Sequence, residues 1–84
     1  MKRALVTGGS GGIGAAICRR LAADGHHVIV HGNRSLDKAE AVVTAIRAAG
    51  GSAEAVAFDV TDRAATAAAL ETLLASGPIQ ILVN

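Results

Sequence analysis

The sequence predicts an α/β fold in which helices cover both faces of a doubly wound parallel sheet. Four short apolar runs alternate along the 84 residues with three longer stretches whose apolar residues recur at helical spacing. Short apolar runs are typical of parallel strands buried on both faces, and their alternation with helices indicates right-handed crossovers. With 51% hydrophobic and 18% charged residues, the chain has a globular composition and not that of a disordered segment.

A run of glycines separates the first strand from the first helix. Arg3–Thr7 is the apolar run that ends at these glycines. Gly12–Asp24 is the helical stretch that follows, and Gly25 is its stop signal. The inner face of this helix is expected to consist of Ile13, Ala16, Ile17 and Leu21.

The second and third helices are preceded by capping residues. Ser35 caps the second helix, which Gly50–Gly51 ends. Asp62 caps the third helix, which ends at Gly77–Pro78. Their inner faces are expected to consist of Ala39, Val42, Val43 and Ile46 and of Leu70, Leu73 and Leu74. The remaining strands are expected at His27–His31, Ala53–Phe58 and Ile79–Val83.

Five glycines lie within "TGGSGGIG", Thr7–Gly14. Glycine loses backbone entropy on folding, so such a cluster indicates a sharp turn or a close approach. Bare N–H groups at the positive end of a helix dipole suit a phosphate or pyrophosphate, and a turn without a ligand is the alternative. The stretch matches G-x-G-x-x-G from Gly9, and both T-G-x-x-x-G-x-G and T-G-x-x-G-x-x-G from Thr7. The Lys-containing phosphate loop is excluded, because Gly14 is followed by two alanines.

The segment "HGNRS" after the second strand predicts the cofactor. A dinucleotide fold that binds NAD has a carboxylate here for the ribose 2′-hydroxyl, but residues 31–35 contain no acid. Arg34 follows Gly14 by twenty positions, and a guanidinium there suits a 2′-phosphate. We therefore expect NADP(H), bound by Arg34 with Asn33 and Ser35 as neutral donors. The alternative for Arg34 is that it is an ordinary exposed arginine. For His31, we consider both a place framing the adenosine pocket and a structural one.

Several other classes of site are disfavoured. The net charge is +1 and the basic residues are scattered, which argues against nucleic-acid binding. The three histidines are not spaced as metal ligands with the single cysteine, Cys18, which we expect to be a small buried side chain. No leader pattern or run of about 20 apolar residues occurs, so we expect a cytoplasmic protein without a membrane partner.

With these motifs assembled, the chain resembles the short-chain dehydrogenase/reductase family, and within it the NADPH-dependent 3-oxoacyl-acyl-carrier-protein reductase group. The nucleotide loop, "HGNRS", the "DVTD" turn at Asp59–Asp62 and the terminal "ILVN" occur in the family's order along the whole chain. Gly32 departs from the family pattern, which commonly has a tyrosine there. The resemblance implies a Rossmann-type sheet of strand order 3-2-1-4, of which residues 1–84 are the N-terminal half.

The resemblance also assigns roles to two acidic-turn residues and to the last residue. In the family, the first Asp of the turn meets the adenine amino group, which corresponds to Asp59, and Val60 offers its backbone N–H to the ring. Asn84 corresponds to the first Asn of the family's "NNAG" strand end. The candidate cofactor-binding residues are Gly8, Ser10, Gly12, Ile13, Gly14, Asn33, Arg34, Ser35, Asp59, Val60 and Asn84.

The catalytic residues of the family are not recognised in this chain. Its carbonyl reductases use a Ser, a Tyr-x-x-x-Lys pair and usually an Asn, whereas this sequence contains no tyrosine. We therefore expect no catalytic residue and no metal site within residues 1–84, and a fragment whose fourth strand would otherwise be an exposed edge. The expected function is the NADP(H)-binding segment of a short-chain carbonyl reductase in fatty acid biosynthesis. Its expected substrate is a small-molecule or acyl-carrier-protein-bound carbonyl compound, with a 3-oxoacyl thioester favoured and a sugar- or steroid-type substrate as the alternative.

Two other functions stay open at this stage. One is a non-catalytic NADP-sensing module on the same fold, and the other is a fragment of an S-adenosylmethionine-dependent methyltransferase. The lack of an acid in residues 31–35 disfavours the methyltransferase. By family resemblance we expect a homo-oligomer, usually a tetramer.

Overall fold

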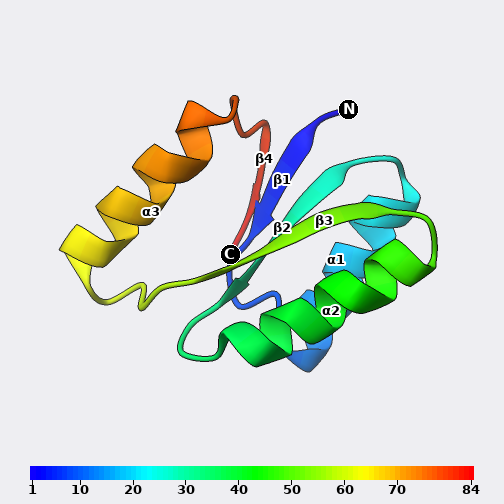
Figure 1. Cartoon of the computed structure of the whole chain (residues 1–84), viewed down its shortest axis with the longest axis horizontal. Coiled ribbons are helices and arrows are strands. Elements are labelled where there is room, and N and C mark those ends of the chain that lie inside the picture. The colour runs from blue at the N-terminus through cyan, green and yellow to red at the C-terminus, as the bar shows by residue number, and fades with distance from the viewer.

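The computed structural model describes residues 1–84 and contains a four-stranded parallel sheet with three helices. The strand order is β3-β2-β1-β4, as predicted, and the fold is Rossmann-like (Figure 1). The elements along the chain are β1 (Arg3–Val6), α1 (Gly12–Ala23), β2 (His27–Gly32), α2 (Leu36–Ala48), β3 (Ser52–Ala57), α3 (Arg63–Ala75) and β4 (Ile81–Val83). Helices α1 and α2 cover one face of the sheet, and α3 lies on the other (Figure 1).

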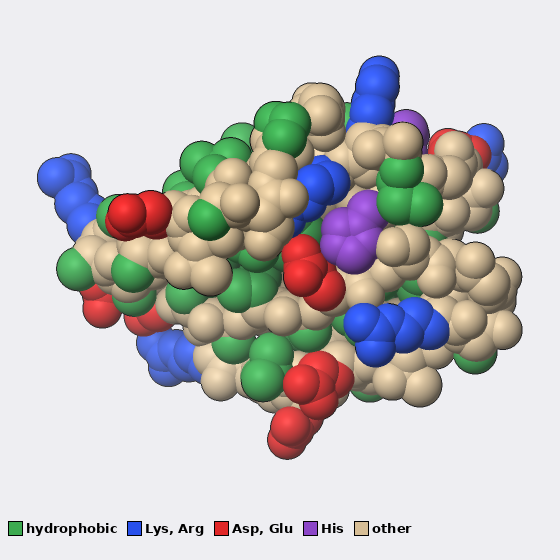
Figure 2. Space-filling view, turned by 45° about the horizontal axis from the view of Figure 1, so that its top comes forward, with side chains coloured by type: hydrophobic (Ala, Val, Ile, Leu, Met, Phe, Trp, Pro, Cys, Tyr) green, Lys and Arg blue, Asp and Glu red, His purple; other side chains and the backbone are tan.

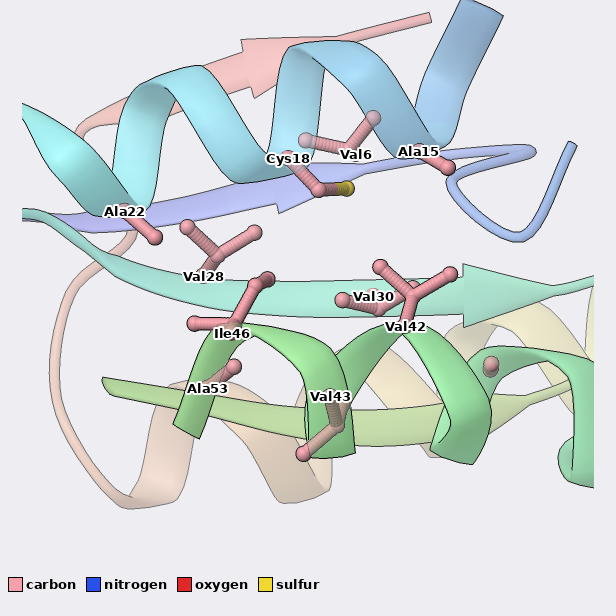
Figure 3. Packing of buried hydrophobic residues seen from close by; sticks show 11 residues of the cluster. Val6, Ala15, Cys18, Ala22, Val28, Val30, Val42, Val43, Ile46 and Ala53 are labelled. Carbon is pink, nitrogen blue, oxygen red and sulfur yellow. The ribbon is translucent and has the colours of Figure 1, made fainter. Parts of the chain in front are cut away.

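The main core lies between the sheet and the α1–α2 pair. The side chains of Val28 and Val30 in β2 lie between the two helices, and Ile46 and Val42 of α2 approach them from one side (Figure 3). The four predicted inner residues of α2 are all buried. This agreement follows from their spacing, since residues three and four apart share one helix face.

The predicted inner face of α1 is only partly correct. Its buried residues are Ala15, Cys18 and Ala22, while Ile13 is 82% exposed and Ala16 is also exposed. Ile17 and Leu21 are only half-buried at the margin of the core. Small side chains on the inner face let α1 pack close to the sheet, and the larger apolar residues are therefore displaced from it.

Helix α3 covers the opposite face less completely. Its only buried residue is Leu73, which packs with Leu5 and Ile29 of the sheet. Leu70 is half-buried, whereas Leu74 is 53% exposed, so its predicted inward orientation is wrong. The helix is rich in alanine, which gives it a high helix propensity but little apolar area to bury.

Strand β4 begins at Ile81, two residues later than predicted. The N–H of Arg3 donates to the side-chain oxygen Oε1 of Gln80 at 2.9 Å, and not to a backbone carbonyl. The Gln80 N–H donates in turn to the Arg3 carbonyl at 3.0 Å. A side-chain acceptor thus replaces the first rung of the ladder, which delays the start of the strand.

The predicted helix ends are confirmed. Gly25 and Gly50 have φ of +93° and +87°, a conformation that glycine adopts without a Cβ clash. At the end of α1, the Gly25 N–H donates to the Ala22 carbonyl and the His26 N–H donates to the Leu21 carbonyl. These are the two hydrogen bonds of a Schellman motif, and they direct the chain into β2.

Acidic, basic and histidine side chains are intermixed on the face shown in Figure 2, and no large basic patch is visible there. None of the helices is both long and apolar enough to cross a bilayer.

Candidate functional site

The candidate residues gather at the carboxyl edge of the sheet. Because all four strands are parallel, the loops that follow β1, β2 and β3 and the residue that follows β4 lie at the same edge. Ligands of open α/β sheets bind at this edge, near the point where the strand order reverses. Here that point lies at β1, which pairs with β2 on one side and β4 on the other.

Three of the five glycines after β1 are required by the fold itself. Gly8 has φ of +67°, which side-chain-bearing residues rarely adopt. A Cβ on Gly14 would overlap the Gly8 carbonyl oxygen. A Cβ on Gly9 would lie 2.9 Å from the Cys18 Sγ. These three positions therefore have a structural reason to be glycine whether or not a ligand binds.

Gly11 and Gly12 differ from the other three. A Cβ on Gly12 would meet no atom within 4 Å, and one on Gly11 would make only an ordinary 3.5 Å contact with the Gly8 carbonyl oxygen. Both residues are exposed and have negative φ. Packing within the chain thus leaves two glycines unexplained, and they mark the open space at the start of α1.

Four backbone N–H groups at this point have no hydrogen-bond partner in the chain. The N–H groups of Gly8, Gly9, Gly11 and Ala15 are all bonded. The unpaired ones are those of Ser10, Gly12, Ile13 and Gly14. In addition, α1 has glycine at its N-cap and no acidic residue in its first turn. The open space and the free donors suit a phosphate or pyrophosphate oxygen.

The other two helices begin differently. The Ser35 hydroxyl accepts a hydrogen bond from the Lys38 N–H at 3.4 Å, and Asp62 Oδ1 accepts one from the Ala65 N–H at 3.0 Å. Both caps were predicted, and each satisfies donors that would otherwise face solvent. Of the three helices, only α1, which follows the loop after β1, begins without a side-chain cap.

The side chains of Ser10 and Ile13 flank this open space. Ser10 is half-buried, and its hydroxyl is within reach of a ligand in this space. Ile13 is 82% exposed beside the unpaired N–H groups. An apolar side chain exposed at this position is available to cover an apolar part of a bound molecule.

Residues Asn33, Arg34 and Ser35 form the turn between β2 and α2. Arg34 and Asn33 are exposed, and the guanidinium of Arg34 forms no ion pair. Ser35 accepts through its oxygen as the cap of α2, which leaves its O–H free to donate. Gly32 has no room for a Cβ because the Ser35 carbonyl occupies that space. The tight turn therefore explains why no larger residue stands at position 32.

Asp59 and Val60 follow β3 on the neighbouring loop. The Thr61 hydroxyl and the Thr61 N–H both donate to Asp59 Oδ1, at 2.7 and 2.9 Å. These bonds, and a weaker attraction to Arg34, lower the pKa of the Asp59 carboxyl below its ordinary value. The carboxylate is therefore ionised at neutral pH and keeps its second oxygen as an acceptor.

The Val60 N–H is engaged within the chain. It donates to Asn33 Oδ1 at 3.1 Å, which joins the turn after β2 to the loop after β3. An adenine ring that used this N–H, as the family resemblance implies, would displace the Asn33 side chain from it. The Val60 side chain is 50% exposed and offers an apolar surface next to Asp59.

Asn84 lies at the end of β4, next to β1. The Thr7 hydroxyl lies 3.1 Å from Asn84 Oδ1 and 3.2 Å from the Val83 carbonyl oxygen. The structure thus brings Asn84 to the same edge as the glycine loop, through Thr7.

Sequence reasoning left the role of His31 open, and the structure shows a buried, structural role. Its ring is 1% exposed, and its two nitrogens are bonded to the loop after β1 and to the end of β3. It therefore presents no surface that could frame an adenosine. Only its place at the end of a buried strand, where a polar residue needs partners, could have indicated this role.

Neither a metal-ligand cluster nor a thiol of low pKa is found at this site. No group of three or more His, Cys, Asp or Glu side chains could hold a metal ion. Cys18 is buried beneath the glycine loop, and burial raises the pKa of its thiol to about 11. A thiol that stays protonated is a poor nucleophile, which agrees with the predicted structural role of this cysteine.

Comparison with known proteins identifies the family of this chain and several of its relatives. The family model described as short chain dehydrogenase matches residues 2–84. An uncharacterized oxidoreductase of Bacillus subtilis, UxuB, is 45% identical over 99% of this chain and 30% of its own length. The 3-oxoacyl-[acyl-carrier-protein] reductase FabG of Staphylococcus aureus is 40% identical over 99% of this chain and 34% of its own length.

A solved structure agrees in fold as well as in sequence. The crystal structure of a metagenomic short-chain oxidoreductase in complex with NADP superimposes with a TM-score of 0.92 and 41% identity. The match covers 96% of this chain and 37% of that one. The chain therefore spans about a third of the length of the proteins that it matches.

Proposed function

Because the chain belongs to the short-chain dehydrogenase family, we propose that residues 1–84 are the NADP(H)-binding segment of a longer carbonyl reductase. The observation that carries this proposal is the set of four unpaired N–H groups beside the open space at Gly12. A dinucleotide's bridging phosphates would accept from these donors at the positive end of α1. The family assignment removes the methyltransferase alternative.

The choice of NADP(H) over NAD(H) rests on the turn after β2. Arg34 is exposed and has no ion-pair partner, so its guanidinium is available to a 2′-phosphate. Asn33 and Ser35 retain free donors on the same turn. Asp59, on the facing loop, would accept from the adenine amino group through its free oxygen, and Asn84 would border the site from β4.

This segment would hold and orient the cofactor, whose nicotinamide would supply the hydride for reduction of a carbonyl carbon. Since the chain has no tyrosine, the proton donor of the family would come from the part of the protein beyond residues 1–84. The similarity to a 3-oxoacyl-[acyl-carrier-protein] reductase supports a 3-oxoacyl thioester as substrate. Because members of the family are typically oligomeric, we also propose a homotetramer.

The test is a titration of the full-length protein with NADPH and NADH, read from the fluorescence of the reduced nicotinamide. Arg34→Ala is expected to weaken NADPH binding roughly 10- to 100-fold, the value of a charge-assisted hydrogen bond, and to leave NADH binding unchanged. Arg20→Ala is the matched control. It removes a positive charge whose ion pair with Asp24 is exposed and lies at the far end of α1.

Three outcomes separate the alternatives. Equal weakening by both substitutions would contradict the proposed role of Arg34. Binding of NADPH without reduction of 3-oxoacyl thioesters or other carbonyls would favour the NADP-sensing module. Absence of binding by the unchanged protein would contradict the proposed function as a whole.

A further inference from the structure

His31 lies at the end of β2, and both of its ring nitrogens are bonded to backbone groups. The Gly8 N–H donates to Nδ1 at 3.0 Å, and Nε2 lies 2.7 Å from the Phe58 carbonyl oxygen. A peptide N–H can only donate and a carbonyl can only accept. The ring is therefore neutral, with its proton on Nε2, and it satisfies one group on each neighbouring loop.

The Gly8 peptide determines where the glycine loop lies. Its carbonyl oxygen accepts from the Gly11 N–H at 3.1 Å, and Gly14 packs against the same carbonyl so closely that a Cβ has no room. Gly8 also has the only positive φ in the loop. A hydrogen bond that holds the Gly8 N–H therefore also holds the start of α1. At this point the unpaired N–H groups of the helix point outward.

The Phe58 carbonyl determines where the next loop begins. Phe58 immediately precedes Asp59, its N–H donates to the Gly32 carbonyl at 3.2 Å, and its ring lies on the His31 ring with centroids 4.3 Å apart. Both side chains are buried. The orientation of His31 is therefore transmitted to the peptide that carries Asp59.

We propose that His31 is a positioning residue that sets the glycine loop and the Asp59–Val60 loop at the spacing required by a dinucleotide. The proposal rests on the proposed function, because the loops are taken to bind the phosphates and the adenine. It goes beyond that function in assigning the spacing to one buried side chain, which touches no ligand itself. An apolar ring of the same size would fill the space but leave the Gly8 N–H and the Phe58 carbonyl unpaired.

Two substitutions separate positioning from simple packing. His31→Phe keeps a ring and removes both nitrogens, whereas His31→Asn is smaller but keeps an oxygen near the position of Nδ1. On the full-length protein, His31→Phe is expected to raise the Kd for NADPH about tenfold or more, as expected for a lost buried hydrogen bond. His31→Asn, which can still accept from the Gly8 N–H, is expected to stay within about threefold of the unchanged protein. His26→Asn, in the turn before β2, is the control.

The reverse order would overturn the proposal. If His31 only fills space, the ring of His31→Phe preserves NADPH binding and the small side chain of His31→Asn weakens it. Far-UV circular dichroism establishes that each variant is folded at the temperature of the titration. Absence of NADPH binding by the unchanged protein would overturn both the proposed function and this inference, whereas equal binding by all three proteins would overturn the inference alone.

A measurement on the unchanged protein decides the matter even if His31→Phe does not fold. With histidine and glycine labelled by ¹⁵N, nuclear magnetic resonance is expected to show a protonated Nε2 and a bare Nδ1 on His31. The Gly8 amide is expected to exchange its hydrogen slowly in the absence of ligand, and the Gly12 amide quickly. A proton on Nδ1, or fast exchange at Gly8, would contradict the proposal.

Discussion

The two edges of the sheet use their polar groups in opposite ways. At the amino edge, Arg3 donates to the carbonyls of Leu73 and Gly77 at the end of α3, and its guanidinium lies 3.5 Å from Glu54. His27 lies 3.4 Å from the same carboxylate. At the carboxyl edge, His31 and Asn33 bond to backbone groups of neighbouring loops, while four N–H groups at the start of α1 stay unpaired.

This difference separates what holds the fold together from what the fold presents to a ligand. The amino edge has a basic side chain at the negative end of α3, where it stabilises the helix and ties it to β1. At the carboxyl edge, the buried His31 holds the backbone of the neighbouring loops from inside the fold. The unpaired N–H groups at the start of α1 stay exposed on the outer side of the same edge. Substitutions at the amino edge should therefore change stability alone, and those at the carboxyl edge should change binding, stability or both according to which group they touch.

The largest effect on stability is expected from substitution of Gly14, and Gly12 is its matched comparison. Gly14→Ala is expected to lower the free energy of unfolding by about 3 kcal/mol, because its Cβ overlaps the Gly8 carbonyl oxygen and the loop must shift. Gly12→Ala, whose Cβ meets no atom of the chain, is expected to change stability by less than about 1 kcal/mol. Urea denaturation followed by circular dichroism measures both values.

Nucleotide binding should respond to Gly12→Ala even though stability hardly does. Although Gly12→Ala leaves the fold intact, its methyl group enters the space in which we place the phosphates, so NADPH binding is expected to weaken at least tenfold. Unchanged NADPH affinity in Gly12→Ala would show that this glycine has no ligand-related reason to be bare.

Arg3 tests the amino edge. Arg3→Met keeps most of the side chain's length and removes the charge, which leaves the Leu73 and Gly77 carbonyls without their side-chain donor. We expect the free energy of unfolding to fall by about 2 kcal/mol, since the guanidinium is mostly buried and makes several bonds. The ratio of the Kd values for NADPH and NADH should not change. A change in this ratio would show that the two edges are coupled.

Much of this division could be predicted from the sequence, because it depends on local signals. The parallel sheet followed from the strand–helix alternation, whereas its strand order came from the family resemblance. The caps Ser35 and Asp62 and the stops Gly25 and Gly50 followed from residue type and position. The failures involved packing. The inner face of α1 consists of Ala15, Cys18 and Ala22 because the helix lies close to the sheet, and periodicity alone favoured the larger residues.

The candidate site shows the same limit. Its glycines and Arg34 could be found as motifs, but the free or bonded state of each N–H depends on contacts between loops that are far apart in sequence. The bonds from Gly8 to His31 and from Val60 to Asn33 span 23 and 27 positions. No local pattern encodes such pairs, so neither the bonding partners of His31 nor the engagement of the Val60 N–H could be foreseen.

Cys18, beneath the glycine loop, gives a smaller effect with a defined pH dependence. Its thiol has a pKa of about 11 in the folded chain against an ordinary value of 9.0. Between these values the unfolded chain releases a proton that the folded chain keeps, so raising the pH favours unfolding. Stability is expected to be nearly constant with respect to this group below pH 9 and to fall by about 2 kcal/mol between pH 9 and 11.

Comparison with Cys18→Ala isolates this contribution, since the lysines and the N-terminus titrate in both proteins. Urea denaturation at several values between pH 8 and 11 should give a smaller loss of stability in the alanine variant. If the two proteins lose stability in parallel, the thiol is more accessible to water than its position under the loop implies.

Asp59 gives the smallest effect and separates the contributions within the carboxyl edge. The hydroxyl and N–H of Thr61 are the main causes of its lowered pKa, and Arg34 is the least. Thr61→Val removes the hydroxyl at nearly constant shape and is expected to raise the pKa of Asp59 toward its ordinary value, more than Arg34→Ala does. Titration of the ¹³C carboxyl resonance of Asp59 measures both shifts. A larger shift in Arg34→Ala would mean that the guanidinium is held by Asp59 before any cofactor arrives, and then the 2′-phosphate would have to compete with a carboxylate for it.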